Sequence, residues 1–80
     1  MTVTVLLFAS YAEALGKSAV DVDVGSGATV SDLLMRLREM PGADRLPPAP
    51  LVAVNEEYAT RDRVLAQGDE VAVIPPVAGG

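Results

Sequence analysis

Hydrophobic and polar positions along the chain predict two strands at its start, one open to water and one covered. Thr2 to Ala9 is a nearly continuous run of β-branched and apolar residues, which is typical of a strand covered on both faces and therefore central in a sheet. Ala19 to Val24 alternates instead, with valines on one face and aspartates on the other, so we expect that face to be solvated. A short helical turn over Tyr11 to Leu15, ended by Gly16, is expected between them.

The next segment has the apolar spacing of an amphipathic helix, at i, i+3, i+4 and i+7. The residues on this stripe are Val30, Leu33, Leu34 and Leu37. Thr29 is placed to cap the helix, with Asp32 three residues later as a weaker form of the capping box. Gly25 to Gly27 precedes the cap but lacks the further glycine and the lysine of a nucleotide loop, so it indicates a break between elements. We expect Pro41-Gly42 to end the helix.

The remainder of the chain predicts three more strands. In order, it contains a proline-rich loop over Ala43 to Pro50, a strand over Leu51 to Asn55, a turn over Asn55 to Glu57, an edge stub at Tyr58 and Ala59, a turn over Gln67 to Glu70 and a last strand over Val71 to Ile74. This order predicts an α+β fold of β-grasp type, with a mixed sheet of about five strands, one main helix packed across it and a short helical turn after the first strand. We expect the first and last strands to pair in parallel at the centre, residues 1–75 to form the domain, and residues 76–80 to be a flexible tail.

Composition and charge narrow the classes of partner. Eighty residues suit one domain with a modest core, and the absence of Cys and His excludes disulfides and leaves no thiolate or imidazole to bind zinc. Asp21 and Asp23 are expected to be solvated and not to bind a metal. The net charge of −5 argues against nucleic acid or an anionic membrane as a partner. The N-terminus lacks the basic region of a signal peptide and its apolar run is too short to span a bilayer, so we expect a cytoplasmic protein.

The chain ends on two glycines directly after its last predicted strand and Pro75-Pro76. Two adjacent glycines at a given place have a chance of roughly 0.5%, although small residues also collect at frayed termini. Prolines hold an extended backbone and glycines leave nothing to obstruct a narrow channel. Five residues, 76–80, reach at most about 17 Å when extended. The candidate functional group is therefore the main-chain carboxylate of Gly80.

Three stretches resemble one family. Val5 to Ala9, Ala53 to Asn55 and, above all, Gly68 to Gly80 look like the small subunit of molybdopterin synthase, the MoaD-type sulfur carrier. The resemblance covers the whole chain in length and element order and implies a ubiquitin-like β-grasp fold. The chain departs from the family at Ala12, where many members have a basic residue, and at Val73-Ile74, where aromatics are common.

The family resemblance implies a carrier with no catalytic pocket and no bound cofactor of its own. A ubiquitin-activating-type, MoeB-type adenylyltransferase would use ATP to adenylate Gly80, and sulfur would then replace AMP. The resulting thiocarboxylate would enter the MoaE-type large subunit, in a heterotetramer, and donate sulfur to cyclic pyranopterin monophosphate in molybdenum cofactor biosynthesis. The active site itself is expected on the large subunit.

The site residues implied by the resemblance all lie at the end of the chain. They are Gly79 and Gly80 for the sulfur chemistry, and Ile74, Pro75, Pro76, Val77 and Ala78 for contacts with the partner. Phe8 is expected in the core. Arg61 and Arg63 are expected in a solvated turn, with pairing to acidic groups of a partner as the alternative.

Several other functions share this ending or this fold. A sulfur carrier of the thiamine type has the same fold and glycine pair but is usually shorter and lacks the Pro-Pro-Val approach. A carrier for cysteine or thionucleoside synthesis, a ubiquitin-like modifier joined to lysines, and a β-grasp interaction domain with an inert tail remain alternatives.

Overall fold

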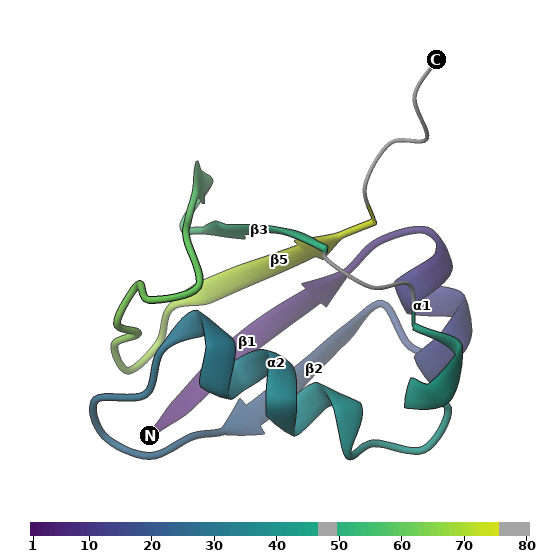
Figure 1. Ribbon diagram of the computed structural model, residues 1–80, viewed down its shortest axis with the longest axis horizontal. Helices are drawn as coiled ribbons and strands as arrows, with labels where there is room; N and C mark the ends of the chain where they lie inside the picture. Colours follow the sequence, from purple (N-terminus) through teal and green to yellow (C-terminus); the bar gives the residue numbers. More distant parts are fainter. Residues whose placement is uncertain (47–49, 76–80) are drawn as a thin grey trace.

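One five-stranded mixed sheet, crossed on one face by a helix, organises the chain (Figure 1). The computed structural model describes residues 1–46 and 50–75. Its elements are β1 (Thr2–Leu7), α1 (Ser10–Leu15), β2 (Ala19–Asp23), α2 (Val30–Arg38), the 3-10 helix η1 (Ala43–Arg45), β3 (Leu51–Val54), β4 (Glu57–Tyr58) and β5 (Glu70–Ile74). The predicted β-grasp fold is confirmed. The proposed tail, residues 76–80, lies outside the described residues.

The strand order β2-β1-β5-β3-β4 places β5 in the middle of the sheet. β5 pairs in parallel with β1 and antiparallel with β3, so its backbone is hydrogen-bonded on both sides. In Figure 1, β1 and β5 run side by side toward the end of the sheet near α1. The predicted central parallel pair is confirmed, and the chain beyond Ile74 continues from the middle strand of the sheet.

Only one face of β1 is covered, which corrects the prediction that both faces would be. Val3, Val5 and Leu7 are buried, whereas Thr2, Thr4 and Leu6 alternate with them and are half-buried. In a central strand both edges are hydrogen-bonded to neighbouring strands, but a face is covered only where a helix packs on it. The open face of β1 is polar at its start, where Thr2 and Thr4 are paired with Asp23 and Asp21 of β2.

The aspartates of β2 are solvated, as predicted, and bond to β1. The Thr2 hydroxyl donates to the Asp23 carboxylate at 2.7 Å, and the Thr4 hydroxyl donates to Asp21 at 3.0 Å. These exposed cross-strand bonds fix the register of the edge strand β2 against β1. Their role is structural.

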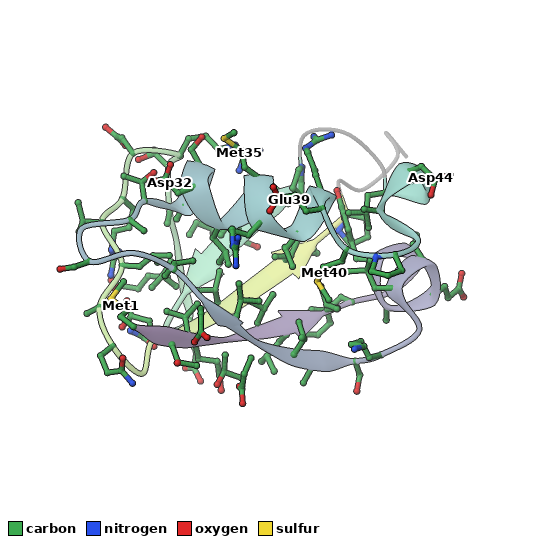
Figure 2. The ribbon with its side chains drawn as sticks, turned by 90° about the horizontal axis from the view of Figure 1, so that it is seen from below. Met1, Asp32, Met35, Glu39, Met40 and Asp44 are labelled. Carbon is green, nitrogen blue, oxygen red and sulfur yellow. The ribbon has the colours of Figure 1, made fainter. Side chains whose placement is uncertain are left out.

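Helix α2 follows its predicted stripe and cap. Val30, Leu33 and Leu37 are buried against the sheet. The Asp32 amide donates to the Thr29 hydroxyl at 3.3 Å and the Thr29 amide donates to the Asp32 carboxylate at 2.9 Å, so the capping box is complete. Figure 2 shows Met40, just beyond α2, on its sheet side and Met35 on the side of α2 turned away from β1.

The helix and hairpin boundaries differ in detail from the predictions. α2 ends at Arg38, before Pro41, and part of the predicted 43–50 loop is the 3-10 helix η1. Asn55 and Glu56 both have positive φ and form a two-residue turn, so Glu57 belongs to β4 and not to the turn. β4 lies at the sheet edge, as predicted.

Phe8 is 46% exposed, so its predicted place in the core is wrong. Tyr11 of α1, only 2% exposed, takes the core position at this end of the sheet. The change of direction between them occurs at Ala9, which has φ 48° and ψ −120°. Only glycine adopts such angles easily, so the backbone is strained there. Gly16 ends α1 in the left-handed conformation, as predicted.

Replacing Ala9 with glycine is expected to stabilise the domain. Relief of a backbone conformation that costs of order 1–3 kcal/mol should outweigh the extra unfolded-state entropy of glycine, about 0.5–1 kcal/mol. We expect a net gain of about 1 kcal/mol in the free energy of unfolding, measured by urea denaturation. Ala12→Gly, inside α1, is the control and should destabilise. A loss of stability in Ala9→Gly would contradict the strain argument.

Candidate functional site

The end of β5 is the described part of the predicted site. Ile74 is half-buried and opposite Leu51 of β3, and Pro75 follows it, also half-buried. On the other side, the Phe8 amide donates to the Val73 carbonyl at 3.3 Å and extends the pairing with β1 past the end of that strand. The other predicted site residues, Pro76, Val77, Ala78, Gly79 and Gly80, lie outside the described residues and stay predictions.

Apolar residues gather on the open face of the sheet next to this end. Leu6, Ala72, Ala53 and Tyr58 are paired in a row across β1, β5, β3 and β4. The next pair toward the end of β5 is Ile74 and Leu51. We call these six residues, with the adjacent Phe8, the exit patch.

Three of the exit patch residues are large and well exposed. The exposed fractions are 76% for Tyr58, 46% for Phe8 and 42% for Leu51. Grouped large apolar side chains on a surface are typical of a protein contact, whereas single ones are ordinary. The exit patch is therefore a candidate docking surface beside the C-terminal end of β5.

The other half of the open face is polar. Thr4 pairs with Asp21 on one side and with Glu70 on the other, and Thr2 pairs with Asp23. On this open face, the paired residues are charged or polar near the start of β5 and apolar near its C-terminal end. A partner that covers the apolar half would therefore lie next to the end of β5, where the chain leaves the sheet.

A hydrogen-bond network at the polar end fixes the register of β5. Asn55 donates to the Asp69 carboxylate at 2.9 Å and accepts from the Glu70 amide at 3.0 Å. The Ala66 amide donates to Asp69 at 2.8 Å. The two bonds that Asp69 accepts, from the Ala66 amide first and from Asn55 second, hold the pKa of Asp69 below its usual value. The network joins β3 to the start of β5 and so helps to hold the strand that positions the exit.

The side chains around the exit offer little chemistry of their own. Within residues 1–46 and 50–75, no group of three or more His, Cys, Asp or Glu side chains is placed to hold a metal ion. None of the helices in these same ranges is long and apolar enough to cross a membrane. The exit patch is an apolar surface of a kind suited to a protein contact.

Ile74 and Pro75 are contacts with a partner that the sequence predicts, and this stays a prediction. The sequence-based prediction does not include Leu6, Leu51 and Tyr58, and it places Phe8 in the core, although Phe8 is exposed. Alternation alone places Leu51 and Ala53 on one face of a strand. The signal that joins them to Leu6 and Tyr58 is the register across four strands, which needs the strand order. Because the sequence predicts that both faces of β1 are covered, it does not predict an exposed apolar face that includes Leu6.

Comparisons with known proteins show consistent similarity over the whole chain. The model of the ThiS family matches residues 5–80. A molybdopterin synthase sulfur carrier subunit of Dictyostelium discoideum is 36% identical over 80 residues, covering 95% of this chain and 93% of that protein. The subunit of the same name in Chlamydomonas reinhardtii is 37% identical over 83 residues, with both chains covered fully (100%). The crystal structure of SAMP1, small archaeal modifier protein 1, from Haloferax volcanii has a TM-score of 0.84 and 37% identity over 100% of both chains.

Proposed function

We propose that this chain, which belongs to the ThiS family, is the sulfur carrier subunit of a molybdopterin synthase. The observation that carries the proposal is the full-length similarity to subunits of that name, in a chain that ends on Gly79-Gly80. The fold supports it, because the tail follows Pro75 in the sequence, just after the central strand β5, and the exit patch lies beside the end of that strand. The proposal places the protein in the cytoplasm.

The proposed chemistry takes place on the carboxylate of Gly80. A carboxylate is a poor acyl electrophile, so an activating MoeB-type enzyme would first transfer AMP from ATP to it and release pyrophosphate. A sulfur nucleophile would then attack the acyl carbon and expel AMP, leaving a thiocarboxylate. This group would attack the pterin substrate in the large subunit, and hydrolysis would return the carboxylate. The chain would thus act as a co-substrate whose sulfur is consumed and whose carboxylate is regenerated, and it would bind no cofactor itself.

The exit patch is the proposed contact with the MoaE-type large subunit, in a heterotetramer. The word "subunit" in the names of the relatives implies a partner for those proteins. In this chain, Ile74 is paired with Leu51 of β3, two positions before the tail in the sequence. Docking there would fix the direction of the tail, and the two prolines would keep it extended into a narrow active site.

Replacing Leu51 with glutamate is expected to weaken binding to the large subunit by at least about tenfold, because a charge would be buried in an apolar contact. Leu51 is 42% exposed, so the free domain should keep its fold. Affinity is measured by calorimetry or biolayer interferometry. Val64→Glu is the matched control, since Val64 is 60% exposed and outside the exit patch. Equal affinities of the two variants would place the contact elsewhere.

Intact mass spectrometry tests the proposed function directly. After incubation with ATP, the activating enzyme and a sulfur donor, the chain should gain about 16 Da, as oxygen is exchanged for sulfur. The product should then yield molybdopterin with the large subunit. An unchanged mass would refute the carrier function, and product with a thiazole synthase instead would assign the chain to the thiamine type.

A ubiquitin-like modifier is the second candidate. It is favoured by the similarity to small archaeal modifier protein 1, at 37% identity over both full chains. Activation of Gly80 is shared by both functions, but the acceptor differs. Conjugates to lysines of other proteins in cells would support the modifier, whereas a thiocarboxylate without conjugates would support the carrier alone.

A further inference from the structure

A partly enclosed cavity of about 180 Å³ lies beside α2 on the helix side of the sheet. One wall is a continuous face of α2, formed by Ser31, Leu34, Met35 and Arg38 at i, i+3, i+4 and i+7. Pro50 and Arg61 also line it, as does Val73 of β5, the residue before Ile74. We call this space the arginine cavity. It lies on the opposite face of the sheet from the exit patch.

The two arginines of this cavity are close to the same buried group. Burial raises the pKa of Tyr11, another lining residue, above its usual value, and the charges of Arg38 and then Arg61 oppose this rise. Arg61 Nη2 also donates to the Pro50 carbonyl at 3.0 Å, which holds this guanidinium against the wall. A guanidinium has five N–H donors, so one such bond leaves others for a ligand.

The charge around the arginine cavity differs from that of the chain as a whole. The chain has eleven acidic and six basic residues, yet the described residues that line the cavity include two arginines and no aspartate or glutamate. Arg36, two positions before Arg38, is paired instead with Glu39 at 3.5 Å on the exposed side of α2. Arg38 and Arg61 are both exposed, and two positive charges beside a largely apolar space attract an anion between them.

The size and donor geometry indicate the kind of anion. One water occupies about 30 Å³ in the liquid, so the volume is enough for roughly six waters and for one small anionic group. The planar fork of a guanidinium matches the two oxygens of a carboxylate or phosphate. We propose that the arginine cavity binds one oxyanion, a carboxylate or phosphate group, between Arg38 and Arg61. The oxyanion comes from a free small molecule or from an acidic side chain of a bound protein.

Titration of the isolated chain tests binding of a free oxyanion. Sodium phosphate and sodium acetate are added in separate NMR experiments at constant ionic strength, with sodium chloride as the reference. We expect saturable shifts of the Ser31, Arg38 and Arg61 amides with at least one oxyanion. Arg38→Gln and Arg61→Gln should each raise Kd by about tenfold or more, because each removes charge-assisted hydrogen bonds. Arg36→Gln, on the same helix and with the same change in charge, should leave Kd unchanged.

Binding to proteins tests the other source of the oxyanion. The same variants are compared for affinity to the large subunit and to the activating enzyme, after circular dichroism has shown that they are folded. Weaker binding of Arg38→Gln and Arg61→Gln, with Arg36→Gln unaffected and no response to free anions, assigns the cavity to an acidic side chain of that partner. Saturable free-anion binding that needs both arginines assigns it to a small molecule. No response in either experiment, or equal responses in all three variants, would overturn the proposal.

Discussion

Replacement of Gly80 with phenylalanine is expected to abolish the mass gain of about 16 Da that marks the thiocarboxylate. The aromatic side chain would lie next to the reacting carboxylate, where a narrow channel of the activating enzyme has to accept the chain. Adenylation and sulfur transfer act on the same carbonyl carbon, so both steps should fail. Mass spectrometry with ATP, the activating enzyme and a sulfur donor measures the result.

The fold of the Gly80→Phe variant should be unaffected, because all the described strands and helices precede Pro75. Its melting temperature should stay within about 2 °C of the parent value. Gly25→Phe is the matched control, since a Cβ added at Gly25 would have no heavy atom within 4 Å and Gly25 is far along the chain from the tail. A normal mass gain in Gly80→Phe would show that the terminal residue does not enter a confined site.

Replacement of Gly42 with alanine is expected to cause the largest loss of stability. Gly42 has φ +90°, which side chains rarely adopt, and an added Cβ would overlap the carbonyl oxygen of Ala14 in α1 and lie 3.3 Å from its carbon. The overlapping atom is backbone, so a rotamer change cannot relieve it. Strain at positive φ and overpacking together predict a loss of about 3 kcal/mol in the free energy of unfolding.

Urea denaturation, treated as a two-state transition, measures the Gly42→Ala effect. Gly25→Ala serves as the control because an added Cβ meets open space there and φ is not positive. The folded Gly42→Ala fraction should still gain sulfur, since the substitution is at the junction of α1 and η1 and not at the tail. A free energy of unfolding equal to that of Gly25→Ala would mean that α1 and Gly42 are not in close contact.

Local pattern was sufficient for the elements of this fold. The capping box of Thr29 and Asp32, the buried stripe of α2 and the alternation of β2 depend on residues a few positions apart, so the sequence shows them directly. The prediction of which residues are buried was wrong where the chain changes direction after β1. Phe8 continues the apolar run of β1, but the turn at Ala9 brings Tyr11 into the core in its place.

The sequence by itself determined the order of elements, the β-grasp fold and the Gly-Gly ending that resembles the sulfur carriers. Only the tertiary structure decided which side chains meet. The exit patch joins Leu6 to Tyr58 through register across four strands, and the arginine cavity brings Arg38 of α2 close to Arg61, 23 positions later in the chain. The physical reason is that the spacing of apolar residues determines on which face of its own helix or strand a side chain lies. Strand order and helix packing determine which side chains of other elements lie next to that face.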